Sequence, residues 1–345
     1  MVKNKIKAVK IIFLVMASLA VWGQAARADV NDRSMWVWEQ DTRDAIYDPA
    51  KAQALLDFSS AKNIKTLYLY SDSYLGVDDV TAHPDYYRSF ISKAHAQGIQ
   101  VDALLGSMYL KTWEYILPEK RADALAMVNN VLGYNGSSSS AQKFDGFNVD
   151  IEPYILSDWD SKQTYYAGLY LDTVAAQKQL IANSGQALDY GLCIPRWYDD
   201  VSALQNIAYN GQVKPLYQQI QDMSQYVSIM DYVNSAGAIV YDASNELGYA
   251  DSINRKVDIG VETQDIQPSS STFYGFTEQG MESVLATAGQ GLNAYPSYDG
   301  FAMDHYGSYS EMTVPEPSTL MLILSGCLIF LAKSNGLFRK LCFLM

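Results

Sequence analysis

Residues 144–154 read FDGFNVDIEPY and place three acidic side chains within an apolar stretch of strand length. Side chains alternate between the two faces of a strand, so Asn148, Asp150 and Glu152 share one face, whereas Asp145 points the other way. Three polar groups on one buried face are costly unless they bond to each other or to a ligand. The stretch therefore predicts a strand that leads into a functional site.

Seven other stretches of strand length have a similar apolar and aromatic character. Together with 144–152, the predicted strands are 34–38, 64–70, 99–106, 188–195, 226–233, 256–263 and 298–306. Apolar residues spaced three and four apart predict helices between them. These helices cover 49–62, 84–97, 119–132, 162–183, 214–223, 241–253 and 277–288.

Regular alternation of strands and helices predicts parallel strands, and eight of them favour a closed (β/α)8 TIM barrel, an α/β fold. A doubly wound open sheet is the alternative. That fold more often has a glycine-rich phosphate loop after its first strand, and WVWEQDTRD at 36–44 has none. Only GSYSEMT at 307–313 follows the last strand, so a regular eighth helix is not expected.

The ends of the chain are predicted to lie outside this domain. Residues 1–28 have a lysine-rich start, an apolar middle and the small-residue site Ala26-Arg27-Ala28, as in a secretory signal peptide. We expect a signal peptidase to cleave after Ala28, which leaves residues 29–312 as the barrel domain and residues 313–345 as a tail.

The tail reads VPEPS from Val314 to Ser318, then an apolar run from Leu320 to Ala332, then a basic end. A plain membrane anchor is one interpretation, although the run is short for a spanning helix. The three-part order resembles the PEP-CTERM sorting signal of Gram-negative bacteria. This resemblance implies transient insertion into the inner membrane, removal by an exosortase, and delivery to the cell surface or the extracellular matrix.

Charge and cysteine content narrow the classes of partner. The chain has a formal net charge of −13, and its two ends carry an excess of basic residues, so the central domain is more acidic still. Such a surface repels nucleic acid, whereas a neutral glycan is easier to accommodate. Cys193 is the only cysteine outside the tail, and with three histidines in the chain no metal site or other cofactor is expected.

The ends of the predicted strands carry the candidate site, because chemistry in such barrels occurs where the strands end. A neighbouring carboxylate and partial burial would both raise the pKa of Glu152, as a general acid requires. The stretch resembles the strand-four signature of the family 18 glycoside hydrolases, with Asp145, Gly146, Asp150 and Glu152 on matching positions. The resemblance implies that Glu152 protonates the glycosidic oxygen and that Asp150 orients an N-acetyl group acting as the internal nucleophile.

The similarity extends to SIMDYV at 228–233, where Met230 and Tyr232 match the Met-x-Tyr of that family's strand six. Three positions depart from the pattern. Asn148 replaces an Asp, Val233 stands where an Asp usually follows the Tyr, and His305 replaces a Trp on strand eight. These departures weaken the case for chitin as the substrate but leave the proton donor in place.

A second arrangement uses Glu262, which ends the predicted seventh strand on the same face as Asp258. Carboxylates after strands four and seven are typical of a large clan of retaining glycosidases whose acid/base lies in Asn-Glu-Pro. Glu152-Pro153 matches that motif, but Ile151 replaces the Asn. Glu262 would then be the nucleophile, with the two carboxyls about 5 Å apart. The alternative is that Glu262 only caps the following turn.

Aromatic residues near the strand ends are candidate sugar contacts. The chain has 26 tyrosines, and flat rings with a polar edge can stack on sugar faces. Trp197, just past strand five, is the favoured platform. The other predicted substrate contacts are Trp38, Tyr70, Tyr232, Asn148, Asp304 and His305.

These observations predict a secreted glycoside hydrolase that acts on an extracellular or cell-envelope glycan. A non-catalytic carbohydrate-binding protein on a degenerate hydrolase barrel is the alternative, motivated by Asn148 and by the missing tryptophan on strand eight. An enzyme with a non-glycan substrate also remains open, because a fold does not determine a function.

Overall fold

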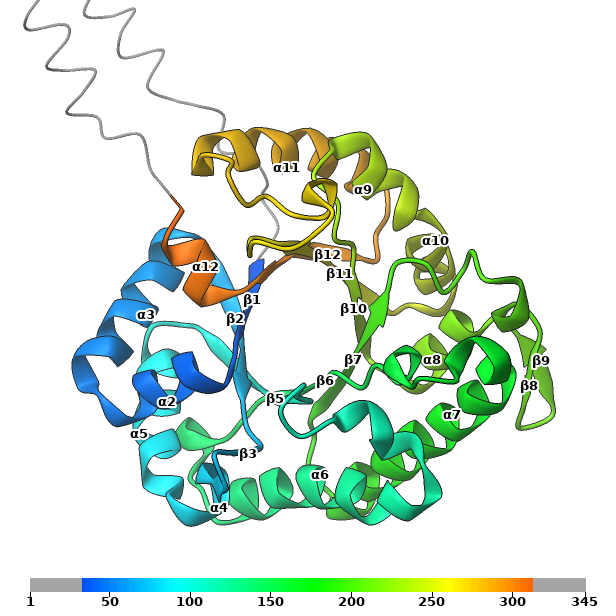
Figure 1. The fold of residues 1–345 in the computed structure, drawn as a ribbon. Helices are drawn as coiled ribbons and strands as arrows, with labels where there is room; N and C mark the ends of the chain where they lie inside the picture. The colour runs from blue at the N-terminus through cyan, green and yellow to red at the C-terminus, as the bar shows by residue number, and fades with distance from the viewer. Residues whose placement is uncertain (1–32, 313–345) are drawn as a thin grey trace, which may run out of the picture.

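The computed structural model describes residues 33–312, so the predicted signal peptide and sorting tail lie outside the described residues. Eight parallel strands close into a barrel in the order β1-β12-β11-β10-β7-β6-β5-β2 (Figure 1). They are β1 (Arg33–Val37), β2 (Ile64–Tyr70), β5 (Gln100–Leu105), β6 (Gly146–Val149), β7 (Asp189–Pro195), β10 (Tyr226–Met230), β11 (Lys256–Glu262) and β12 (Tyr298–Asp304). The predicted TIM barrel is confirmed, and the open doubly wound sheet is excluded.

The helices surround the barrel (Figure 1). They are α2 (Glu39–Tyr47), α3 (Pro49–Ala61), α4 (Asp79–Ala82), α5 (Pro84–Ala96), α6 (Arg121–Gly136), α7 (Trp159–Ser184), α8 (Leu216–Met223), α9 (Ala236–Asp242), α10 (Ser244–Ile253), α11 (Glu278–Leu292) and α12 (Tyr306–Ser310). No helix within residues 33–312 is both long and apolar enough to cross a membrane.

The loops contain short two-stranded sheets and 3₁₀ helices. The two-stranded sheets pair β3 (Ser73–Tyr74) with β4 (Val77–Asp78) and β8 (Ile207–Tyr209) with β9 (Gln212–Lys214). The 3₁₀ helices are η1 (Thr112–Ile116), η2 (Pro118–Lys120), η3 (Ser140–Gln142), η4 (Pro153–Ile155), η5 (Ser202–Leu204) and η6 (Ser269–Ser271).

The eighth helical position is occupied by α12, which has only five residues. The His305 side chain accepts a hydrogen bond from the Gly307 amide and so caps the start of this helix. A short helix thus follows the last strand, where the sequence indicated no regular eighth helix. Because α12 directly follows β12, its cap holds His305 at the rim of the barrel.

Two apolar layers stabilise the molecule. The larger one lies between the strands and the helices, and a smaller one fills the barrel itself. Inside the barrel the Trp36 and Tyr68 rings are 5.4 Å apart, and the Tyr226 ring stacks on Tyr68 at 6.1 Å. Gly191 makes room for this packing, since a Cβ there would lie 2.0 Å from the Tyr226 ring. The interior is therefore packed with side chains, and a ligand can bind only at an end.

Strand four is shorter than predicted. β6 ends at Val149, and the Asp150 amide donates one more ladder hydrogen bond to the Leu105 carbonyl at 2.7 Å. Glu152 then has φ −108° and ψ 73°, and Pro153 begins η4 without an N–H to donate. Asp150 and Glu152 therefore lie just beyond the strand, at the C-terminal end of the barrel.

Candidate active site

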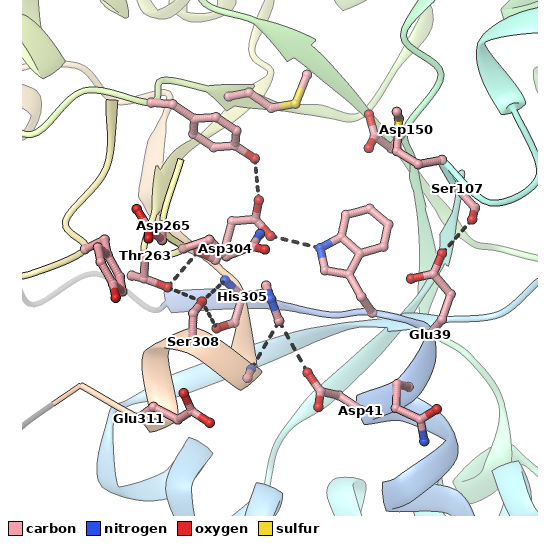
Figure 2. Close-up of a pocket in the computed structure, with 18 of the residues that line it drawn as sticks. Glu39, Asp41, Ser107, Asp150, Thr263, Asp265, Asp304, His305, Ser308 and Glu311 are labelled. Carbon is pink, nitrogen blue, oxygen red and sulfur yellow. Dashed lines mark hydrogen bonds and ion pairs between the residues drawn. The ribbon is translucent and has the colours of Figure 1, made fainter. Parts of the chain in front are cut away.

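A cavity of about 1280 Å³ opens at the C-terminal ends of the strands. Its walls come from the segments after β1, β2, β5, β6, β10, β11 and β12, and Figure 2 shows polar side chains from several of these segments around one hollow. Six of the predicted site residues line it, namely Asp150, Glu152, Asp304, His305, Tyr232 and Trp38. The strand-end argument thus placed most of the candidate residues at one site.

Asp150 and Glu152 form the acidic centre of the cavity. Burial raises the pKa of Glu152 to about 7, and the nearby negative charge of Asp304 adds to the effect. Burial also raises the pKa of Asp150 well above its ordinary value, with further contributions from Glu152 and Asp304. Tyr154 donates a hydrogen bond to Glu152, whereas the buried Oδ1 of Asp150 has no protein partner within residues 33–312. Two such neighbours titrate as a pair, and their raised pKa values favour retention of a proton by the pair near neutral pH.

Asp304 connects two of the predicted substrate contacts. Its Oδ1 accepts a hydrogen bond from the Trp38 indole at 2.9 Å, and its Oδ2 accepts one from the Tyr232 hydroxyl at 2.7 Å (Figure 2). Trp38 and Tyr232 lie just after β1 and β10, so the hydrogen bonds of Asp304 link the ends of β1, β10 and β12. Trp38 and Tyr232 are consequently held in fixed orientations with parts of their rings facing the cavity.

His305 is the only basic side chain among the cavity-lining residues of the described chain. Burial lowers its pKa, but the carboxylates of Asp41 and Asp304 outweigh burial and raise it above its ordinary value. His305 Nδ1 lies 3.3 Å from the Asp41 carboxylate and 3.1 Å from the Gly307 amide. Nδ1 accepts a hydrogen bond from the Gly307 amide when the ring is neutral, and it donates one to the Asp41 carboxylate when the ring is protonated.

Glu262 does not line the cavity. Its side chain is buried at the end of β11, and Oε1 accepts hydrogen bonds from the amides of Thr263 and Gln264, both at 2.7 Å. Burial raises the pKa of Glu262 to about 8, again with a contribution from Asp304. This geometry is that of a residue that caps the turn after its strand.

Three further predicted contacts lie outside the cavity lining. Asn148 is buried inside the barrel, where it accepts from the Trp36 indole at 2.9 Å and donates to Ser228 at 3.1 Å. Tyr70 is buried and donates to the Ser73 carbonyl at 2.9 Å. Trp197 packs edge-on against Tyr154, with ring centroids 5.1 Å apart. Asn148 and Tyr70 therefore belong to the packed interior beneath the cavity. Trp197 packs against Tyr154, which donates a hydrogen bond to Glu152.

Several lining residues were not predicted. Glu39 and Asp41 follow β1, and Glu39 accepts a hydrogen bond from Ser107 at 2.5 Å. They lie immediately after a predicted strand, so the strand-end argument could have identified them. Asp265 likewise lies two residues after a predicted strand. Other additions lie further from the predicted strand ends, namely Trp113, Tyr74, Tyr274, Phe276 and Glu311.

No protein-family model matches the chain, and no curated protein matches it in sequence. Solved structures do resemble it. An exo-β-1,4-mannosidase from an Opitutaceae bacterium has a TM-score of 0.54 and 10% identity, over 82% of this chain and 53% of that one. A β-galactosidase from a psychrophilic Marinomonas has a TM-score of 0.53 and 9% identity, over 88% and 60% of the two chains. A chitinase from Ipomoea carnea has a TM-score of 0.45 and 16% identity, over 79% and 94%.

The mannosidase and the galactosidase share the barrel with this chain, and identities of 10% and 9% establish the fold alone. The chain is therefore a closed (β/α)8 barrel with an acidic and aromatic cavity where its strands end, and solved glycoside hydrolases share this barrel fold.

Proposed function

We propose that the protein is a glycoside hydrolase whose general acid is Glu152. The observation that carries this proposal is the setting of Glu152, a carboxyl that lines a large cavity and whose pKa is raised to about 7. A carboxyl with such a pKa is partly protonated at neutral pH and can still give up its proton, which is the property that a general acid needs. Aromatic walls suited to sugar faces support the same function.

In the proposed reaction Glu152 donates its proton to the glycosidic oxygen as the bond to the anomeric carbon breaks. Asp150, two residues away, orients an N-acetyl group whose carbonyl oxygen attacks the anomeric carbon from the other side. Water then opens the resulting cyclic intermediate, and the Glu152 carboxylate takes up the proton of that water. The position of Asp150 in the cavity lining beside Glu152 supports this role, because a carboxylate there can accept the amide N–H of the substrate.

The cellular setting belongs to the same proposal. The sequence features of residues 1–28 and 313–345 support export across the inner membrane and sorting by an exosortase. The glycan would then be met at the cell surface or in the extracellular matrix.

Replacing Glu152 by Gln tests the function directly. Glu152→Gln retains the size of the side chain and can form hydrogen bonds, but it has no acidic proton to transfer, so we expect turnover to fall by about 10²–10⁴-fold. Thermal unfolding of the purified variant should match that of the original protein. Asp57→Asn, on the exposed outer face of α3, is the control and should retain full activity. Undiminished hydrolysis by Glu152→Gln would remove Glu152 from the reaction.

A further inference from the structure

The cavity has an unusual balance of charge. Its lining includes seven carboxyl side chains and neither lysine nor arginine. The seven carboxyls belong to Glu39, Asp41, Asp150, Glu152, Asp265, Asp304 and Glu311. Because His305 is the only basic group in this lining, the cavity has a negative potential.

The partners of these carboxyls are almost all neutral. Asp304 is held by an indole and a phenol, Glu39 by a hydroxyl, and only Asp41 contacts a group that can become positive, His305. Asp265 and Glu311 are exposed, and within residues 33–312 their side-chain carboxyls have neither a hydrogen bond nor an ion pair. The lysines and arginines of the described chain form their ion pairs elsewhere, as Arg196 does with Asp242. The charge of the cavity is therefore left for a ligand to neutralise.

The shape of the cavity argues for a large organic cation. A volume of about 1280 Å³ exceeds the range of about 300–1000 Å³ usual for small-ligand pockets and has room for several sugar units. Trp38, Trp113, Tyr74 and the exposed Tyr274 provide rings that can stack on sugar faces and attract positive charge. No group of three or more His, Cys, Asp or Glu side chains in the described chain is arranged to hold a metal ion.

We propose that the bound glycan carries free amino groups, as in a hexosamine polymer from which part of the N-acetyl groups has been removed. This inference rests on the proposed function and specifies its substrate class. It also revises the expectation of a neutral glycan, which considered the surface charge of the protein without the distribution of that charge.

The two kinds of sugar unit occupy different parts of the cavity. The unit beside Asp150 and Glu152 keeps its N-acetyl group, because a protonated amine has no carbonyl oxygen with which to attack the anomeric carbon. Units with free amines lie beside Asp265 and Glu311, which are across the hollow from Asp150 in Figure 2. A fully de-N-acetylated polymer should therefore bind without being cleaved.

Binding measurements with defined oligomers test this assignment separately from catalysis. The probes are glucosamine and galactosamine hexamers in fully N-acetylated, partly de-N-acetylated and fully de-N-acetylated forms, titrated calorimetrically at about pH 6, where amines and exposed carboxylates are both charged. We expect the amine-bearing forms to bind at least about tenfold more tightly than the acetylated form. About 1 M salt should remove this preference, because the Debye length is then about 3 Å.

The double variant Asp265→Asn/Glu311→Gln tests the positions of the amines. We expect it to weaken binding of the partly de-N-acetylated hexamer by about three- to tenfold, as two exposed charge pairs would. Its affinity for the fully acetylated hexamer should be unchanged. Asp57→Asn/Asp299→Asn removes the same charge from the outer helix α3 and from the start of β12 and should affect neither ligand.

The outcomes distinguish the claim that the substrate carries free amines from the claim that the protein is a hydrolase. Equal affinity for acetylated and de-N-acetylated hexamers, with hydrolysis of the acetylated one, would overturn the cationic substrate and leave the hydrolase intact. Preferential binding of amine-bearing hexamers without hydrolysis of any form would support the ligand class and contradict the hydrolase. An equal effect of the two double variants would also overturn the assignment, because only one of them alters the cavity.

Discussion

Glu152 owes its suitability as an acid to its neighbours. Burial and the negative charge of Asp304 both disfavour the ionised form, and together they raise the pKa of Glu152 to about 7. Asp304 is held in place by Trp38 and Tyr232, so it perturbs Glu152 from a fixed position. The protonation state of Glu152 therefore depends on residues from three strand ends.

The rate of hydrolysis should consequently fall as the pH rises through about 7. The reaction needs the protonated form of Glu152, and a carboxyl with a raised pKa holds its proton below that pKa and loses it above. Asp304→Asn removes a charge that raises this pKa, so it should move the fall in kcat/KM to lower pH. A pH profile of kcat/KM for both proteins provides the test, and an activity that rises through pH 7 would contradict the assignment.

Glu262 has a different role from Glu152. Its carboxylate oxygen accepts two amides of the turn after β11, and its pKa of about 8 leaves it mainly protonated at neutral pH. A protonated carboxylic acid is a poor nucleophile. The structure therefore favours the capping interpretation over the retaining two-carboxylate mechanism.

Glu262→Gln should retain activity to within about threefold. The amide oxygen of Gln can accept the same two N–H groups, so the turn after β11 is preserved. Steady-state kinetics beside Glu152→Gln provide the measurement. If Glu262 were the nucleophile, its loss would instead abolish turnover, and addition of azide would restore cleavage of an activated glycoside.

The sequence predicted cavity-lining residues where these lie at or just after the end of a strand. Asp150, Glu152 and Asp304 could be located because the carboxyl ends of parallel strands meet at one face of a barrel. Trp197 satisfied the same argument but packs against Tyr154 outside the lining. Sequence spacing shows where a strand stops, but it does not show in which direction the following loop turns.

At the scale of elements, the junction between β5 and β6 positions Asp150, two residues before the proposed acid. Gly106 follows β5 with φ +140°, and a Cβ there would lie 2.0 Å from the Asp150 carbonyl oxygen. Because the ends of β5 and β6 approach each other closely, the chain turns away from β6 at Asp150, where the cavity begins. A glycine at this position is therefore needed for conformation and for space.

Gly106→Ala should lower both stability and activity. The clash and the unfavourable backbone conformation should reduce the free energy of unfolding by about 1–3 kcal/mol, and displacement of Asp150 should reduce kcat. Gly133→Ala in α6 is the matched control, since a Cβ there meets nothing within 4 Å. It should raise stability by about 0.5–1 kcal/mol. Chemical denaturation of both variants measures this, and equal stabilities would refute the role of Gly106.

Helices and strands differ in how far they could be predicted. All eight barrel strands were found, because each is a buried apolar run. The predicted helix 241–253 corresponds to α10, whereas α9, which directly precedes it, and α2 were missed. α2 ends at Tyr47, where Asp48 caps α3 and Pro49 opens it. Its polar sequence EQDTRDAIY has little apolar periodicity, so contacts with the rest of the barrel stabilise it.

At the scale of the whole molecule, closure of the barrel brings distant residues into one cavity. Trp38 and Asp304 are far apart in the sequence, yet their side chains bond at 2.9 Å because β1 pairs with β12. The acidic lining likewise collects side chains from both ends of the described chain. Only three-dimensional closure reveals this charge distribution, which explains why the net charge alone predicted a neutral glycan.

The most direct test of the account is the release of new reducing ends from a panel of glycans by the purified protein. The panel holds partly de-N-acetylated and fully N-acetylated hexosamine polymers, a fully de-N-acetylated polymer and neutral hexose polymers. The account predicts release from polymers that contain N-acetylated units and none from the others. Release of reducing ends from neutral hexose polymers would contradict the proposed mechanism, and glycan binding with no release from any polymer would contradict the hydrolase itself.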